Sequence, residues 1–134
     1  METAELKART RQFALDVIDL CTTFGNDDFA QVTRRQLLRA GTGVAANYRG
    51  ACRSRSSREF ASRLATVVEE ADESEFWLDL LQVRRYGAPK AVAGLQQEAI
   101  ELRSIFAKSR TTTLQGLRER RKKRRNEPRN PEKL

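Results

Sequence analysis

A heptad pattern runs through the middle of the chain and constrains the fold more than any other feature. Small and apolar residues recur at alternating four- and three-residue steps, at Phe60, Leu64, Val67, Ala71, Ser74, Leu78 and Leu81. This spacing puts them on one face of a helix. The helix is predicted to start at a capping box, Ser56 with Glu59, and to end at Arg84-Arg-Tyr-Gly87. Because a long apolar face must be covered by other helices, the pattern predicts a helical bundle.

Three more helices are predicted from the same kind of spacing. The first runs from about Glu5 to Phe24, with an apolar face of Leu6, Thr10, Phe13, Val17, Leu20 and Phe24, widened by Ala14, Ile18 and Cys21. The second is predicted to be capped by Asp28 or by Thr33, and it carries Leu37, Gly41, Val44, Tyr48 and Cys52. The last begins at Pro89 and carries Val92, Leu95, Ala99, Leu102 and Phe106, and Leu114 and Leu117 would prolong it. Four helices joined by short turns predict an all-α fold, an antiparallel up-down-up-down four-helix bundle.

Two glycines, Gly41 and Gly43, fall inside the second predicted helix. Each costs about 1 kcal/mol relative to alanine within a helix. We expect a continuous helix in which the small residues allow close packing against a neighbour. The alternative is a break in the helix at these two positions.

Positive charge is concentrated at the C-terminal end. The formal net charge is +8; residues 118–134 hold nine basic and three acidic residues, which is +6, so residues 1–117 carry +2. We expect a four-helix bundle over residues 1–117 and a basic, partly disordered tail over 118–134, disordered after Asn126. A cationic segment beside a nearly balanced body favours a polyanion partner, RNA or DNA, although many basic tails only aid solubility.

The candidate nucleic-acid-binding residues lie in this tail and in a Ser/Arg turn before the third helix. They are Arg118, Arg120, Arg121, Lys122, Lys123, Arg124 and Arg125 in the tail, and Arg53, Arg55 and Arg58 in the turn. The tail has no aromatic residue and no apolar stripe, so neither base stacking nor membrane insertion is predicted. The expected binding is electrostatic and without sequence preference.

The chain contains no histidine, which removes histidine-based catalysis and the Glu-x-x-His ligands of di-metal bundles. It also lacks the Gly-x-x-x-x-Gly-Lys pattern of a phosphate-binding loop. We therefore predict no catalytic residue, no metal and no cofactor. A cluster of carboxylates is interpreted either as partners of Arg34, Arg35, Arg39 and Arg49 across the helical hairpin or as a solvated acidic face; it consists of Glu69, Glu70, Asp72, Glu73, Glu75 and Asp79.

Nothing in the sequence points to a membrane or to secretion. The N-terminal residues 1–6 lack the cationic start and apolar stretch of a signal peptide, and no apolar run approaches the roughly 20 residues of a membrane-spanning helix. Cys21 and Cys52 lack metal-like spacing, and two buried thiols fit better than a disulfide. We expect a cytoplasmic protein.

Three segments together resemble the bacterial 23S rRNA intervening-sequence protein family. They are Gln36-Leu-Leu-Arg-Ala-Gly-Thr-Gly-Val-Ala-Ala-Asn-Tyr-Arg49, Ser56-Ser-Arg-Glu-Phe60 and Glu69-Glu-Ala-Asp-Glu-Ser-Glu-Phe-Trp-Leu-Asp-Leu-Leu81. The structural signature within them is predicted to be Arg39, Asn47, Tyr48, Glu70, Glu73 and Trp77. A buried Asn in a helical seam more often fixes register than binds a ligand, and the tryptophan is interpreted as a core or interface residue.

The resemblance implies a four-helix bundle and a homo-oligomer, since relatives assemble into rings, often pentamers. Related bundles serve as accessory proteins of reverse transcriptases in diversity-generating retroelements. The family has no established enzymatic activity, so the resemblance supplies no catalytic residue. The expected function is that of a non-enzymatic, oligomeric bundle that binds RNA or DNA. The alternative is a protein-interaction scaffold, such as an accessory subunit of a reverse transcriptase.

Overall fold

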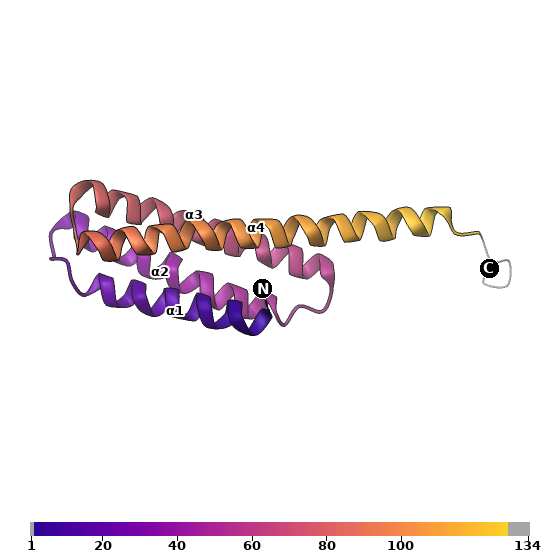
Figure 1. Ribbon diagram of the computed structural model, residues 1–134, viewed down its shortest axis with the longest axis horizontal. Coiled ribbons are helices and arrows are strands. Elements are labelled where there is room, and N and C mark those ends of the chain that lie inside the picture. Colours follow the sequence, from indigo (N-terminus) through magenta and orange to yellow (C-terminus); the bar gives the residue numbers. More distant parts are fainter. Residues whose placement is uncertain (1, 129–134) are drawn as a thin grey trace.

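The computed structural model describes residues 2–128, and these form four α-helices. The helices are α1 (Thr3–Cys21), α2 (Asp28–Ala51), α3 (Ser57–Arg84) and α4 (Pro89–Asn126). Short turns join them, and each helix runs antiparallel to the next (Figure 1). Consecutive helices pack against each other, and α1 and α4 contact each other less than any consecutive pair does. The predicted all-α, up-down-up-down four-helix bundle is confirmed.

The core is built from the apolar faces that the sequence predicts. In α3, the predicted face is buried from Leu64 to Leu81, and Phe60 is half-buried at the end of the helix. The other helices contribute Leu6, Phe13, Val17 and Leu20 from α1, Leu37, Val44 and Tyr48 from α2, and Val92, Leu95, Leu102 and Phe106 from α4. One prediction is wrong: Ile18 is 41% exposed and does not widen the apolar face of α1.

The predicted capping box at the start of α3 is confirmed. Ser56 Oγ accepts a hydrogen bond from the Glu59 N–H at 3.1 Å. The Glu59 carboxylate reaches back and accepts from the Arg55 N–H at 3.1 Å, and it also pairs with Arg63 at 3.1 Å. These contacts, the Arg55 N–H first, lower the pKa of Glu59. The box therefore fixes the backbone of the arginine-rich α2–α3 loop.

The cap of α2 lies one residue before the predicted one. The helix begins at Asp28, but the carboxylate of Asp27 accepts the hydrogen bond from the Ala30 N–H at 2.9 Å. The other proposed cap, Thr33, is buried inside the helix. The Tyr86 hydroxyl donates to the same Asp27 carboxylate at 2.7 Å. The hydrogen bonds from Ala30 and Tyr86 lower the pKa of Asp27 and tie the start of α2 to the turn after α3.

Helix α1 ends at Cys21, before the predicted Phe24. The hydroxyls of Thr22 and Thr23 donate at 2.7 Å to backbone carbonyls of the last turn and compete with its continuation. Arg34 covers the end of the helix, donating to the carbonyl oxygens of Cys21 at 2.9 Å and Phe24 at 2.7 Å. Arg34 is therefore a cap for α1 rather than a partner of the α3 carboxylates.

Both glycines of α2 lie in an unbroken helix, as expected. A Cβ added at Gly41 would lie 3.0 Å from the Val17 methyl carbons of α1. A Cβ added at Gly43 would lie 3.0 Å from Cδ of Glu70 on α3. The two glycines therefore let α2 approach a helix on each side, which confirms the predicted close packing.

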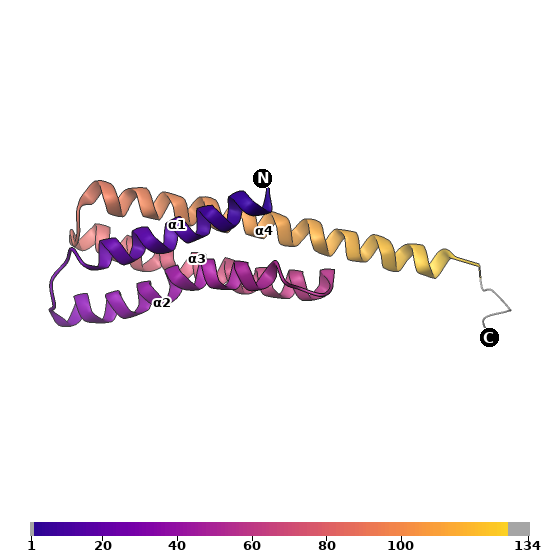
Figure 2. The same cartoon turned by 90° about the horizontal axis from the view of Figure 1, so that it is seen from below.

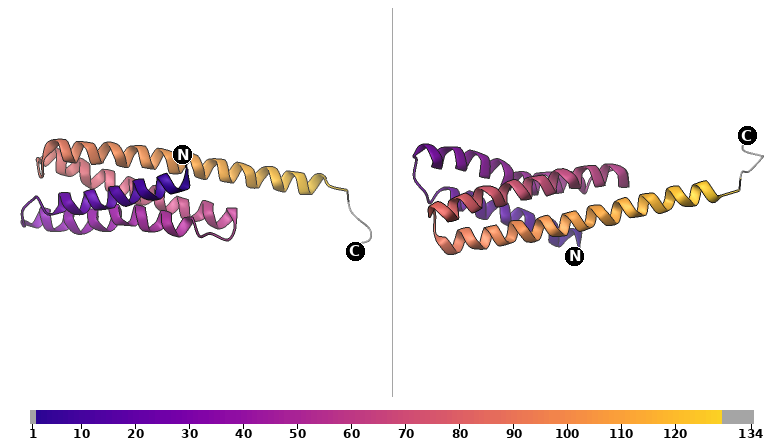
Figure 3. Two further views of the ribbon diagram at one scale, coloured as in Figure 1. Left: turned by 60° about the horizontal axis from the view of Figure 1, so that its bottom comes forward. Right: turned by 90° about the horizontal axis from the view of Figure 1, so that it is seen from above.

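Helix α4 continues far beyond the bundle core. Its buried residues end at Phe106, yet the helix runs to Asn126 and passes Leu114 and Leu117, which are half-buried. It stops where Glu127 turns extended before Pro128, since proline disfavours a helical residue ahead of it. Figures 1, 2 and 3 show this distal part projecting past the α2–α3 loop. The basic tract is thus helical over residues 118–126. Of the segment predicted to be disordered after Asn126, residues 127 and 128 are non-helical and residues 129–134 lie outside the described residues.

Candidate nucleic-acid interface

The three loop arginines are all exposed to solvent. Arg53 and Arg55 lie in the loop between α2 and α3, and Arg58 lies in the first turn of α3. The loop sits at the same end of the bundle from which α4 projects (Figure 1). The structure therefore brings the two predicted groups of cations, which are about sixty residues apart in sequence, to one end of the molecule.

The tail cations lie on the distal part of α4, and all of them are exposed. They are Arg118, Arg120, Arg121, Lys122, Lys123, Arg124 and Arg125. Because successive residues of a helix are rotated by about 100°, six consecutive cations surround the helix rather than forming a stripe. Cations in the last turn interact favourably with the helix dipole, but like charges three and four residues apart repel each other. A polyanion would relieve that repulsion.

One direct contact joins distal α4 to the start of α3, beside the loop arginines. Arg120 Nη2 donates to Ser57 Oγ at 3.1 Å, from α4 to the first residue of α3. It continues the antiparallel register in which Arg103 pairs with Asp72 and Glu75. Sequence reasoning did not single out Ser57. Extending the last predicted helix past Leu117 to Arg120 and aligning it antiparallel to α3 would have found it.

Charge is divided unevenly along the chain. Residues 49–63 hold five arginines and one glutamate, and residues 108–127 hold nine basic and two acidic residues. Residues 64–83, by contrast, hold six carboxylates and no cation. The two basic segments meet at the projecting end, while the acidic segment runs along α3 away from it (Figure 1). The electrostatic field of this charge distribution would attract a polyanion to one end of the molecule.

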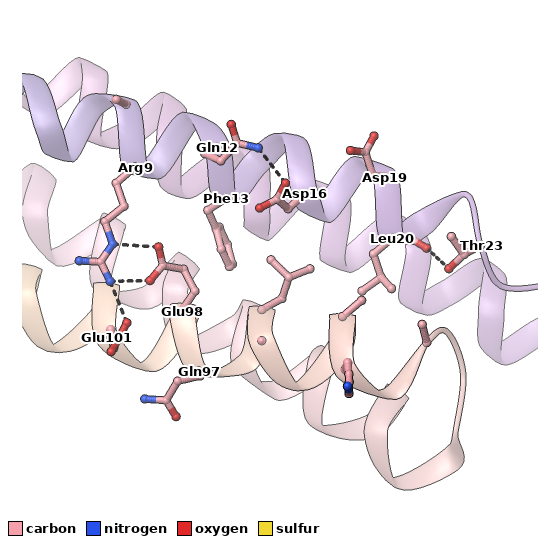
Figure 4. A pocket seen from close by; sticks show the side chains of 16 residues that line it. Arg9, Gln12, Phe13, Asp16, Asp19, Leu20, Thr23, Gln97, Glu98 and Glu101 are labelled. Carbon is pink, nitrogen blue, oxygen red and sulfur yellow. Dashed lines mark hydrogen bonds and ion pairs between the residues drawn. The ribbon is translucent and has the colours of Figure 1, made fainter.

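A groove elsewhere on the bundle is acidic, in contrast to the basic end. An open groove of about 990 Å³ lies between α1 and α4, where the two helices contact each other least. Phe13, Leu20 and Leu95 give it an apolar floor, as Figure 4 shows in part. Its charged lining residues are the acidic Asp16, Asp19, Glu98 and Glu101 and the basic Arg9 and Lys90. The excess of carboxylates makes this groove a poor surface for nucleic acid.

Arg9 holds the groove together at one end. Its guanidinium donates to Glu98 through Nε at 2.8 Å and Nη2 at 2.5 Å, and to Glu101 at 2.8 Å (Figure 4). These contacts, with the Glu98 hydrogen bond largest, raise the pKa of Arg9. The ion pair spans α1 and α4 where few other contacts do, so it positions the two walls of the groove.

Three of the six signature residues form one ion-pair group at the α2–α3 seam. Arg39 pairs with Glu73 at 2.8 Å and lies 3.8 Å from Glu70. Glu70 Oε2 is buried and has no hydrogen-bond partner among the described residues. Burial, followed by the nearby Glu73, raises the pKa of Glu70. Of the four predicted arginine partners, Arg39 alone pairs with the acidic cluster within residues 2–128. Asp72 and Glu75 pair instead with Arg103 of α4.

The other signature residues serve packing. Tyr48 is buried against Phe106, with ring centroids 4.7 Å apart, and burial raises its pKa to about 12. Trp77 is half-buried against the core and makes an edge-to-face contact with Phe76. Asn47 is half-buried and makes no side-chain hydrogen bond within residues 2–128. Of the three, Tyr48 lies nearest the basic end, where it is among the residues that line a hollow beside Arg55 and Arg120.

Three further observations concern metal, thiol and membrane chemistry. Within residues 2–128, no group of three or more acidic or cysteine side chains is arranged to hold a metal ion. Cys21 is a buried free thiol whose pKa burial raises to about 11, and Cys52 is a half-buried free thiol. None of the helices in this part of the chain has the length and apolar character needed to cross a membrane.

The comparisons with known proteins bear on the bundle rather than on the basic end. The family model described as 23S rRNA-intervening sequence protein matches residues 2–108. The chain belongs to this family. The family match ends two residues after Phe106, the last buried residue of α4, so most of the distal, basic part of α4 lies beyond it.

A solved structure supports the same assignment. The chain is similar to a protein of unknown function from the S23 ribosomal protein family of Bacteroides thetaiotaomicron. The TM-score is 0.69 and the sequence identity 28%, over 75% of this chain and 94% of that one. No match was found among curated proteins.

Proposed function

We propose that this member of the 23S rRNA-intervening sequence protein family is a non-enzymatic bundle that binds RNA or DNA electrostatically. Binding takes place at the projecting end, through the distal part of α4 and the loop arginines Arg53, Arg55 and Arg58. The observation that carries the proposal is the exposed basic helix over residues 118–125, which holds seven cations and one acid. The family name, which refers to ribosomal RNA, adds support of a different kind.

Physical chemistry predicts how such a surface binds. Each phosphate that a cation neutralises releases counterions, so affinity falls with salt. About six phosphate contacts on a duplex give a slope near −5 for the logarithm of affinity against the logarithm of salt concentration. No aromatic residue lies in the tract, so binding depends on charge and not on base identity.

A salt series on the full chain and on a variant lacking residues 118–134 tests the proposal. Filter binding of a structured RNA should give a slope near −5 for the full chain and a much flatter slope for the variant. Thermal unfolding of the variant serves as the control, because deletion beyond the core should leave the bundle folded. An unchanged slope in a folded variant would remove the tail from the binding surface.

The same protein is further proposed to form a homo-oligomer, as its family resemblance implies. Apolar side chains on two outer faces support an interface: Leu15 and Ile18 on α1, and Phe76 and Val83 on α3. Of these, Val83 is 64% and Phe76 54% exposed. Light scattering during size-exclusion chromatography should give a mass several times 15.3 kDa. A monomer at micromolar concentration would contradict it.

The α1–α4 groove favours a second candidate function, a protein-interaction scaffold such as an accessory subunit of a reverse transcriptase. Its apolar floor and acidic rim suit an amphipathic helix with basic flanks. Affinity capture with the full chain, with and without nuclease treatment, separates the two functions. A partner retained after nuclease supports the scaffold, and one lost with the nucleic acid supports the leading proposal.

A further inference from the structure

A cavity of about 460 Å³ lies where the α2–α3 loop meets α4 at the basic end. Two guanidinium groups, those of Arg55 and Arg120, line it together with the hydroxyl side chains of Ser54, Ser56, Ser57 and Thr113. No acidic residue is among its lining residues. Cations and hydroxyls without a carboxylate offer hydrogen-bond donors to an anion. In this respect the cavity is the reverse of the α1–α4 groove.

Arg120 is positioned by two contacts that leave most of its donors unused. Nη2 donates to Ser57 Oγ at 3.1 Å, and Nε donates to the Gly116 carbonyl at 3.4 Å. An arginine side chain carries five N–H donors in a planar fork, so three remain for a ligand. Within residues 2–128, no carboxylate lies within ion-pair distance of Arg120 or Arg55. Neither guanidinium is thus held in an ion pair, although the Glu59 carboxylate interacts with the Arg55 charge at longer range.

Ser54 adds a hydroxyl to the same cavity. Its Oγ is buried and has no hydrogen-bond partner among the described residues. Buried polar side chains of native proteins nearly always have a partner. Because less than 1 Å² of this oxygen is exposed, a ligand would contact it only after the Ser54 side chain rotates toward the cavity. The backbone of this loop is already fixed, because the Arg55 N–H donates to Glu59 at 3.1 Å.

We propose that this cavity is a phosphate-binding site that holds one phosphate of a nucleic-acid strand between Arg55 and Arg120. The tetrahedral oxygens of a phosphate accept hydrogen bonds from several directions at once, as donors on two facing elements require. Ser57 is a positioning residue that holds the Arg120 fork toward the cavity. The inference rests on the proposed nucleic-acid function and deepens it: distal α4 attracts the polyanion, and the cavity fixes one phosphate in place.

A pair of charge-matched variants on α4 tests the site. Arg120→Gln and Arg121→Gln each remove one cation from the same turn, but only Arg120 lines the cavity. Binding of a short 5′-phosphorylated RNA is measured by fluorescence anisotropy at physiological salt. Loss of one diffuse phosphate contact by Arg121→Gln should weaken binding about fivefold. Arg120→Gln should weaken it about tenfold more, because charge-assisted hydrogen bonds are lost as well.

A double variant adds a second criterion. Arg55→Gln should match Arg120→Gln, and the two together should cost little more than either alone, because both arginines hold the same phosphate. Ser57→Ala should also weaken binding, but by a smaller factor than Arg120→Gln. The loss of affinity caused by Arg121→Gln should be the same with or without Ser57→Ala. Arg55 and Arg121 should instead behave additively.

The outcomes separate the site from the function. Equal losses for Arg120→Gln and Arg121→Gln, with an additive Arg55→Gln, overturn the phosphate site and leave electrostatic binding standing. Salt-independent or undetectable binding by the unaltered chain contradicts the proposed function itself. Repeating the series with 5′-hydroxyl RNA identifies the source of the phosphate: the gap between the two variants disappears for a terminal phosphate and persists for an internal phosphodiester.

Discussion

The two halves of α4 are parts of one unbroken helix and are stabilised in different ways. The proximal half, residues 89–106, contains all five buried residues of the helix and packs into the bundle. The distal half, residues 107–126, has no buried residue and carries nine basic residues and one acidic residue. Burial of apolar surface stabilises the first half, whereas the second relies mainly on helix propensity and the partial contact of Leu114 and Leu117.

The comparison separates fold from function within a single element. The family match ends at residue 108, close to where burial ends, so the shared part is the packed bundle. The distal half is the part of this chain to which we assign binding. Stability and binding should therefore respond to different substitutions, and each prediction below tests that separation.

The largest expected effect on stability lies in the proximal half. Phe106→Ala removes a fully buried ring that contacts Tyr48 at a centroid distance of 4.7 Å. Its free energy of unfolding in urea should fall by about 3–5 kcal/mol. Leu117→Ala is the matched control on the distal half, where the side chain is only half-buried, and should cost less than about 1 kcal/mol. Similar losses for both variants would break the distinction between the halves.

A glycine pair tests whether close packing of the bundle body is required. Gly41→Ala places a Cβ 3.0 Å from the buried Val17 of α1 and should destabilise the protein by about 1–3 kcal/mol. Gly94→Ala, on the exposed side of α4, has no atom within 4 Å of the added carbon. It should instead stabilise the helix by up to about 1 kcal/mol. Urea unfolding of the two variants should therefore give opposite signs, and a stabilising Gly41→Ala would contradict the packing.

The sequence was sufficient to predict the bundle because its apolar period is regular. Leu64, Val67, Ala71 and Leu78 of α3 lie in the core as their spacing requires. Errors arose at helix ends, whose positions depend on local hydrogen bonds. The threonines after Cys21 end α1 early, and Asp27 rather than Asp28 caps α2. The sequence could not show which residue would cap α2, since Asp27 and Asp28 have the same side chain.

The candidate site was less predictable than the fold. The basic residues are visible in the sequence, but the cavity depends on the register between α3 and α4, which sets Arg120 beside Ser57. Leu114 and Leu117 extended the predicted helix to the basic tract, but beyond them charge repulsion and the lack of apolar residues gave no reason to extend it to Asn126. The acidic α1–α4 groove was missed for a related reason: it exists because those two helices pack loosely, and spacing along one helix does not report such a gap.

The smallest predicted effect concerns the pH dependence of the α2–α3 seam. The pKa of Glu70 is raised in the fold, mainly by burial, so its ionised form is less favourable there than in the unfolded chain. The stability associated with the protonated carboxyl is therefore present at low pH and is lost as pH rises through the folded pKa. The free energy of unfolding of Glu70→Gln, taken relative to that of the unaltered protein, should therefore be higher at neutral pH than at a pH of about 4.

Urea unfolding at both pH values measures that difference. The matched control is Glu69→Gln on the same helix, because Glu69 is exposed and forms no ion pair within residues 2–128. It should show no comparable change with pH. If the stability of Glu70→Gln relative to the unaltered protein fell from acid to neutral pH, the result would contradict a carboxylate whose pKa burial raises.

Mapping the contact with RNA most directly tests the central claim that nucleic acid binds at the basic end. Photo-cross-linking of the full chain to a 4-thiouridine RNA, followed by mass spectrometry, identifies the peptides in contact. The predicted result is cross-links in residues 49–63 and 108–127, the segments that meet at the projecting end of the bundle. Cross-links concentrated in residues 8–23 and 88–101, the walls of the acidic groove, would contradict the account.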